Sequence, residues 1–176
     1  MEKIFTEPLE GKIWLLKFHT LPNRESIHMN VQWICKRFDE LLLQELYSIL
    51  RLRNEVFVVE QQCIFQDADN KDQHCHHLLG SINNELVAYT RLLPPGLAYE
   101  EASIGRVVNS PLVRNTGAGK ELMRRSVIEL YQLWGKQPIR IGAQLYLKKF
   151  YESFGFQQVS DIYLEDGIDH IEMLLA

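Results

Sequence analysis

The pattern of apolar and polar positions predicts strands and helices in alternation over most of the chain. Apolar residues recur at helical spacing from Leu41 to Arg53, and again from just after Gly119 to Trp134. Short apolar runs predict strands over 31–38, 78–82, 86–93, 104–108, 138–143, 156–162 and 171–175. These elements predict an α/β (α+β) fold with a mixed sheet and helices packed against it.

Two local signals refine these boundaries. Asp39 precedes the first helical stretch and is expected to be its N-cap. The pair Asn83-Asn84 separates two strand-like runs and predicts a hairpin turn between them.

The first 28 residues differ in pattern from the rest of the chain. They contain Pro8, Gly11 and Pro22, with one strand-like run over 12–18. A segment of this length is too short to bury a core of its own. We therefore expect an N-terminal extension over 1–28, either an appended arm or the product of an upstream start codon, and a single domain over 29–176.

Composition narrows the class of protein. A chain of 176 residues suits one domain. A net charge of −4 and an isoelectric point near 5.9 argue against nucleic acid as a general partner. Cys35, Cys63 and Cys75 are irregularly spaced, which fits a reducing compartment rather than a disulfide framework. No run has membrane-spanning length and no signal peptide is recognisable, so we expect a cytoplasmic protein without a membrane partner.

A glycine-bearing segment, R-N-T-G-A-G over 114–119, lies between the predicted strand 104–108 and the second helix. Two glycines let the backbone approach a ligand closely, and free N–H groups at a helix N-terminus favour an anion. The segment is neither a Walker A loop, because Glu121 follows Gly119-Lys120, nor a dinucleotide fingerprint, because the third glycine is missing. It predicts a pyrophosphate site; the alternative is a simple turn before a helix.

Further motifs follow in a fixed order. After the predicted strand 138–143 come Gln144 and the run F-Y-E-S-F-G-F over 150–156. Together with R-x-x-G-x-G they resemble the GNAT (GCN5-related) N-acetyltransferase superfamily, over roughly residues 31–174. The segments R-N-E-V-F-V-V-E-Q (53–61), D-x-D (67–69), I-G-R-V (104–107) and E-D-G-I-D-H (165–170) are similar to its ElaA-type branch. The resemblance implies a mixed, mostly antiparallel central sheet flanked by helices.

The resemblance also implies acetyl-CoA as co-substrate and a set of residues that hold it. Backbone groups of a strand would pair with the pantetheine arm, and the amides of the glycine-bearing loop would hold the pyrophosphate. Gln144 stands where the family often has Asn, and Leu147 where it often has Ala. The implied cofactor-binding residues are Val107, Val108, Arg114, Asn115, Thr116, Gly117, Ala118, Gly119, Lys120 and Gln144.

Amine acetylation needs three chemical contributions. The backbone N–H of Val108 is our candidate for polarising the thioester carbonyl. Glu60 is the candidate base that neutralises the amine, with the alternative that it pairs with Arg53 or another cation at the helix end. Tyr151 falls where many GNAT enzymes carry the tyrosine that protonates the departing thiolate.

Three further residues are candidates for binding the acceptor. Arg106 interrupts an apolar strand, and it either holds Glu60 or grips a substrate carboxylate. Arg91 is a weaker candidate of the same kind, and His170 has a structural or a binding role. We expect Glu60, Arg106 and His170 to converge beside the thioester and to suit an acceptor with an amine and a carboxylate.

The polar loop 61–75 carries Asp67, Asp69 and Asp72, with several histidines after it. Lys71 breaks a calcium-loop pattern, and the His and Cys spacing does not match a zinc site. We therefore expect no metal, a polar loop that borders the acceptor site, and a hydrogen-bonded core histidine at His77.

Three functions remain open at this point. The first is an N-acetyltransferase that moves an acetyl group directly from acetyl-CoA to the amine of a small molecule or peptide. The second is an acyl-homoserine-lactone-synthase-like acyltransferase, suggested by R-x-x-x-F, the acidic loop and R-L-L-P over 91–94; the intact R-x-x-G-x-G favours the first. The third is a non-catalytic coenzyme A-binding sensor or interaction module, against which Tyr151 weighs. The sequence leaves the acceptor and the oligomeric state open, a homodimer included.

Overall fold

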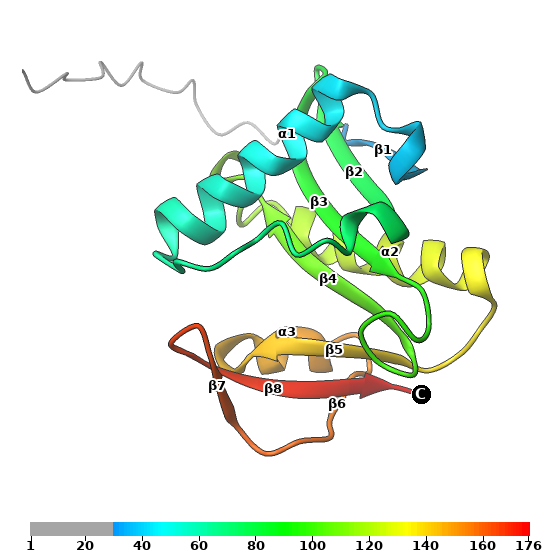
Figure 1. The fold of residues 1–176 in the computed structure, drawn as a ribbon, viewed down its shortest axis with the longest axis vertical. Helices are drawn as coiled ribbons and strands as arrows, with labels where there is room; N and C mark the ends of the chain where they lie inside the picture. The colour runs from blue at the N-terminus through cyan, green and yellow to red at the C-terminus, as the bar shows by residue number, and fades with distance from the viewer. Residues whose placement is uncertain (1–29) are drawn as a thin grey trace, which may run out of the picture.

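The structure is a computed structural model that describes residues 30–176; the predicted extension over 1–28, with its strand 12–18, lies outside the described residues. Its centre is an eight-stranded sheet in the order β1-β2-β3-β4-β5-β8-β6, with β7 also paired to β8 (Figure 1). All pairs are antiparallel except β4 with β5, which confirms the mostly antiparallel sheet. The strands are β1 (Gln32–Arg37), β2 (His76–Ile82), β3 (Glu85–Leu93), β4 (Ala102–Asn109), β5 (Ile139–Gln144), β6 (Gln157–Gln158), β7 (Tyr163–Glu165) and β8 (Ile168–Leu175).

Two longer helices cover opposite faces of the sheet, and Figure 1 shows α1 in front of the strands and α2 behind them. The face under α1 contributes Leu79 and Tyr89, and the face under α2 contributes Leu78 and Ala88, the alternation expected of strands buried on both sides. The helices are α1 (Leu43–Arg53), α2 (Ala118–Trp134) and the short α3 (Lys148–Glu152), with a π-helix over Asn54–Glu60 and 3-10 turns over Phe38–Glu40, Asp72–His74, Pro111–Val113 and Leu145–Leu147.

The apolar stripe of α2 anchors the larger core cluster. Leu122, Met123 and Leu130 are fully buried, and the last two pack in the cluster that holds β4, β5 and β8 together. Complete burial of such a side chain contributes about 1.5–3 kcal/mol. This packing fixes the N-terminal end of α2, which the glycine-bearing loop precedes.

The predicted start of the first helix is wrong by two residues, and Asp39 is not its cap. Asp39 lies in the 3-10 turn and pairs with Arg37, whereas Leu42 occupies the N-cap position in extended conformation. The Glu45 carboxylate accepts a hydrogen bond from the Leu42 N–H at 2.9 Å and supplies the cap. The carboxylate three residues inside the helix thus replaces the expected cap residue.

The predicted strand 156–162 is also largely wrong. Only Gln157 and Gln158 pair with β8, as β6, and Val159 adds one backbone hydrogen bond to Glu172. The chain then leaves the edge of the sheet and returns as β7 on the same strand. Polar residues in the middle of the segment leave it without a continuous buried face.

The feature that positions the site is the divergence of β4 from β5. These parallel strands pair only at Ala102 with Ile139 and at Ser103 with Arg140. The register of β4 against β3 shifts opposite Arg106, which has a positive φ of 50°, so β4 bulges there. Beyond Ser103 this edge of β4 has no strand partner among residues 30–176, and the ribbons separate in Figure 1.

Candidate functional site

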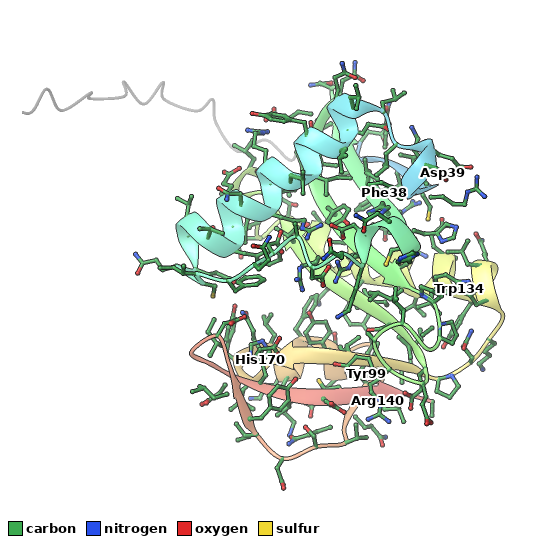
Figure 2. The ribbon with its side chains drawn as sticks, viewed as in Figure 1. Phe38, Asp39, Tyr99, Trp134, Arg140 and His170 are labelled. Carbon is green, nitrogen blue, oxygen red and sulfur yellow. The ribbon has the colours of Figure 1, made fainter. Side chains whose placement is uncertain are left out.

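A cleft of about 360 Å³ lies where β4 and β5 diverge. One wall comes from β4, the end of β3 and the loop after α1, and the other comes from β5, α3 and the β7–β8 hairpin. Figure 2 shows Tyr99 and His170 over β5 and β8, on the second wall. The cleft unites several residues predicted separately: Arg106, Val107, Gln144, Tyr151 and His170.

Tyr151 lies on α3 and faces this cleft while its ring is held in the core. Its side chain is 6% exposed and makes edge-on contacts with the rings of Phe150 and Phe156. Burial raises the pKa of the Tyr151 phenol, so the hydroxyl keeps its proton throughout the neutral range. A protonated group at this place can donate to a leaving atom inside the cleft.

Along its second half, the edge of β4 that faces β5 leaves backbone N–H and C=O groups available to a ligand in extended conformation. Val107 lines the cleft, and the side chain of Val108 is buried in the cluster under α1. The other edge of β4 pairs with β3, where Val108 lies opposite Tyr89. The strand is therefore anchored on one side, and over its second half the other side has no strand partner within residues 30–176.

The glycine-bearing loop forms the N-terminus of α2. Gly117 is the N-cap with φ 91°, a conformation that favours glycine. The first helical hydrogen bond runs from the Glu121 N–H to the Gly117 carbonyl, so the amides of Ala118, Gly119 and Lys120 have no helical acceptor. These three donors and the helix dipole make an anion site.

Gly119 packs closely against the side chain of Asn109. A Cβ at this position would lie 3.2 Å from Nδ2 of Asn109, at the end of β4. The loop itself is stiffened by a hydrogen bond of 2.7 Å from the Thr116 hydroxyl to the Val113 carbonyl. The backbone of β4 therefore leads directly into the anion site.

Arg114 departs from the role predicted for its amide. Its N–H donates to the Pro111 carbonyl at 3.4 Å and is not free for a ligand. Its guanidinium makes a bidentate pair with Glu60 at 2.6 and 2.7 Å. Glu60 therefore pairs with a cation, as the alternative reading expected, but that cation is Arg114 rather than Arg53 or Arg106.

The ion pair between Glu60 and Arg114 makes Glu60 a poorer candidate for the catalytic base. Hydrogen bonds from Arg114 hold the pKa of the Glu60 carboxyl below its usual value, and Glu60 is absent from the cleft lining. A carboxylate stabilised in its ionised form is a weaker proton acceptor. The geometry argues against a catalytic role for Glu60.

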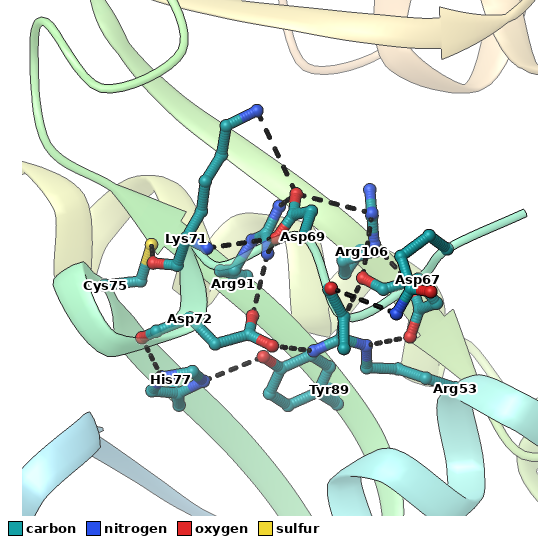
Figure 3. A network of polar contacts seen from close by, with 12 residues as sticks. Arg53, Asp67, Asp69, Lys71, Asp72, Cys75, His77, Tyr89, Arg91 and Arg106 are labelled. Atoms are coloured by element: carbon teal, nitrogen blue, oxygen red, sulfur yellow. Dashed lines mark hydrogen bonds and ion pairs between the residues drawn. The ribbon is translucent and has the colours of Figure 1, made fainter.

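The loop 61–75 is held by a buried ionic network, shown in Figure 3. Arg53 is fully buried and binds Asp67 and Asp72 at 2.8 and 2.9 Å. Arg91 is 3% exposed and binds Asp72 at 2.8 Å and Asp69 at 2.6 Å. Burial raises the pKa of Asp69, but the hydrogen bonds from Arg91 outweigh it and the net shift is downward.

Arg106 joins the same network through the acidic loop. Its Nε donates to Asp67 at 2.7 Å, and its Nη2 lies 3.5 Å from Asp69. Arg91 is buried and its guanidinium is held by Asp69 and Asp72, which favours a structural role over the predicted substrate-binding one. Arg106 keeps a partly exposed guanidinium at the cleft.

His77 extends the network into the core, as predicted for a hydrogen-bonded core histidine. Its ring nitrogens contact the Tyr89 hydroxyl at 2.8 Å and the Asp72 carbonyl at 3.0 Å. Within residues 30–176, no group of three or more His, Cys, Asp or Glu is arranged to hold a metal ion. The aspartates of the loop instead form ion pairs with arginines.

His170 lines the cleft, and a hydrogen bond fixes its tautomer. Its Nδ1 lies 2.9 Å from the Ile168 carbonyl, and because a carbonyl only accepts, Nδ1 carries the proton. In the neutral ring Nε2 therefore has a lone pair. The ring stacks on Tyr163 at 5.9 Å, and in the β5–β8 register His170 lies opposite Gln144.

Sequence reasoning missed several residues of the cleft. Lys71, Tyr99, Glu165 and Asp166 all line it, although none was singled out as a site residue. The D-G pair at 166–167 is a hairpin signal, and it could have indicated that Glu165 and Asp166 lie at a turn. In the part of the chain that the structure describes, no helix is long and apolar enough to cross a membrane.

Comparison with known proteins agrees with this geometry. A family model described as an acetyltransferase (GNAT) domain matches residues 45–176. Protein ElaA of Escherichia coli is 42% identical over 145 residues, which cover 81% of this chain and 95% of the relative. A UPF0039 protein of Synechocystis is 40% identical over 147 residues, or 83% of this chain and 96% of the relative.

Solved structures that are similar to this chain belong to the same kind of protein. The crystal structure of an acyl-CoA N-acyltransferase from Pseudomonas aeruginosa has a TM-score of 0.80 at 42% identity, covering 83% of this chain and 99% of that one. An acyl-homoserine lactone synthase, BjaI, is similar in fold alone, with a TM-score of 0.70 at 15% identity. The chain belongs to the GNAT acetyltransferase family, in its ElaA-type branch.

Proposed function

We propose that the protein is an N-acetyltransferase that transfers the acetyl group of acetyl-CoA directly to an amine. The observation that carries the proposal is one continuous site: the unpaired edge of β4 leads from the anion site at α2 to the cleft lined by Tyr151. A GNAT acetyltransferase from Elizabethkingia anophelis, with the same fold at 15% identity, was solved with acetyl-CoA bound. That likeness supports acetyl-CoA as the donor.

The residues present fit such a donor. The free amides of Ala118, Gly119 and Lys120 would bind the pyrophosphate, with the positive end of the α2 dipole behind them. Val107 and Val108 would pair with the pantetheine arm as an added strand. This arrangement would bring the thioester to the part of the cleft between β4 and α3.

The transfer then needs one bond to form and one to break. The amine nitrogen bonds to the thioester carbon, and the carbon–sulfur bond breaks. The Val108 N–H is proposed to stabilise the charge that develops on the carbonyl oxygen. Tyr151 gives its proton to the departing thiolate and is reprotonated from solvent.

The amine must also lose a proton to a base. His170 is better placed for this than Glu60, because its Nε2 has a lone pair and the residue lines the cleft. Glu60 is ion-paired to Arg114 outside the cleft lining. We therefore assign proton acceptance to His170, directly or through a water molecule.

The test is release of free thiol from acetyl-CoA with a panel of primary amines. The proposal expects amine-dependent thiol release with formation of the acetylated amine. Binding of acetyl-CoA without release, with every amine, would instead support the coenzyme A-binding sensor. Turnover only with long-chain acyl donors and a lactone product would support the acyl-homoserine-lactone-synthase-like alternative.

A further inference from the structure

The wall of the cleft formed by the acidic loop carries more positive than negative side chains. Seven residues are joined by ion pairs into what we call the loop cluster: Arg53, Asp67, Asp69, Lys71, Asp72, Arg91 and Arg106. Four of them are cations and three are carboxylates. Among residues 30–176, no other acid lies within ion-pair distance of these cations, so one positive charge has no counterpart.

This unmatched charge belongs to the side of the cluster that faces the cleft. Arg53 is fully buried and satisfied by Asp67 and Asp72. Lys71 and Arg106 line the cleft, and their contacts with Asp69 are long, at 4.0 and 3.5 Å. Arg106 has one short ion pair, from its Nε to Asp67 at 2.7 Å, and Lys71 has none within residues 30–176. A charge that is partly withdrawn from water gains from a close counter-ion, so the cluster favours an incoming anion here.

Arg91 is the buried cation behind this wall. It lines the cleft and is 97% buried, yet its Nε has no hydrogen-bond acceptor among the described residues. This nitrogen lies inside the wall, because both terminal nitrogens of Arg91 are held by Asp69 and Asp72, so Arg91 adds positive charge behind the cleft surface without contacting a ligand directly.

The opposite wall has the complementary charge. Glu165 and Asp166, at the turn between β7 and β8, line the cleft and form no ion pair within residues 30–176. His170, the proposed base, lies on the same hairpin. A positively charged amine is therefore attracted to the wall where its proton is to be removed.

We propose that the acceptor is a small molecule of the amino-acid class, whose carboxylate binds at Lys71 and Arg106 and whose amine faces Glu165 and His170. The inference rests on the proposed function, because it describes the second substrate of that reaction. Arg106 uses Nε and Nη2 on Asp67, and its Nη1 makes no hydrogen bond within residues 30–176, so Nη1 together with the Lys71 ammonium can donate to a carboxylate. The cleft volume of about 360 Å³ suits a small ligand. The acceptor expected from the sequence, with an amine and a carboxylate, is therefore kept. Glu165 and His170 take the place of Glu60 beside the amine.

The experiment compares matched amines that differ in the carboxylate. Lysine is measured against cadaverine, and tyrosine against tyramine, in acetyl-CoA turnover read as free thiol. We expect kcat/KM to favour the carboxylate-bearing member by about tenfold or more, as for a hydrogen bond to a charged group. Lys71→Gln should remove most of this preference, whereas Lys136→Gln, at an exposed lysine after α2, should leave it unchanged.

Calorimetry of the same pairs with the coenzyme A-bound protein separates the two proposals. Tighter binding of the carboxylate-bearing members, lost in Lys71→Gln, supports the inference even if no amine is acetylated; in that case the proposed function fails alone. Equal or preferred turnover of cadaverine and tyramine overturns the inference and leaves the transferase intact. Neither binding nor turnover of any member overturns both.

Discussion

At the scale of single residues, the site depends on the environment that the fold gives to a few side chains. Tyr151 keeps its proton because it is buried among aromatic rings, and Gly117 adopts a backbone conformation that opens the N-terminus of α2. His170 has its tautomer fixed by one carbonyl. Each of these effects is local, so each can be tested by one substitution.

Tyr151→Phe should retain coenzyme A binding and lower turnover by about 10²-fold or more, the effect of losing a general acid. The ring contacts that hold the residue do not involve the hydroxyl, so the fold is expected to stay intact. Steady-state thiol release and calorimetry measure the two quantities. Tyr47→Phe, at an exposed tyrosine of α1, is the control, and equal rates for both variants would remove Tyr151 from the mechanism.

Gly117→Asp should weaken coenzyme A binding more than about tenfold, because it places a carboxylate beside the bound pyrophosphate. Strain at φ 91° also contributes to the cost of the substitution. Gly96→Asp provides the control, since Gly96 has a φ of 83° and similarly open surroundings. Unchanged affinity in calorimetry would show that the anion site is elsewhere.

At the scale of elements, two contacts connect the segment after α1 to the rest of the site. The π-helix that follows α1 ends at Glu60, whose carboxylate binds Arg114 beside the anion site. The loop after it is held to β3 and β4 by the buried arginine pairs. These contacts set the position of one wall of the cleft.

Glu60→Gln should tighten coenzyme A binding severalfold, because it removes a negative charge near the pyrophosphate and frees Arg114. The size is limited because the two side chains are 43% and 37% exposed, and salt should reduce the effect. Calorimetry at two ionic strengths tests this. A loss of turnover by 10²-fold without tighter binding would restore Glu60 as the base.

Asp72→Asn should destabilise the fold by about 3–5 kcal/mol, because it leaves Arg53 and Arg91 without a carboxylate that both use. Denaturant unfolding measures the change, with the exposed Asp39→Asn as control. If Asp72→Asn lowers the free energy of unfolding by less than Asp39→Asn does, the network does not hold the loop.

The pH dependence of stability follows from the same aspartates. Burial raises the pKa of Asp72, but hydrogen bonds and charges from Arg91 and Arg53 outweigh it, and the net shift is downward; Asp69 behaves likewise. The two aspartates therefore contribute fully to the free energy of unfolding above their unfolded-state pKa near 3.8. This contribution is lost as the pH falls below that value towards the lowered pKa of the folded state. Unfolding free energies measured down the acid range should fall less steeply in Asp72→Asn than in the parent protein.

At the scale of the whole molecule, the parts predicted correctly from sequence are those governed by neighbours along the chain. The strands that became β2, β3 and β4, the helix α2 and the glycine-bearing loop all have local signals of periodicity or turn chemistry. The ion pairs do not, because Arg106 and Asp67 are 39 positions apart and Arg114 and Glu60 are 54 apart. Which cation meets which acid depends on how β4 and the loops pack together.

The central claim is that the opening between β4 and β5 is where acetyl-CoA binds and reacts, and a crystal structure with coenzyme A bound tests it most directly. We predict pyrophosphate oxygens at the amides of Ala118, Gly119 and Lys120, the pantetheine arm along the edge of β4, and the sulfur within hydrogen-bond reach of Tyr151 Oη. Coenzyme A bound away from α2, or a sulfur far from Tyr151, would contradict the account.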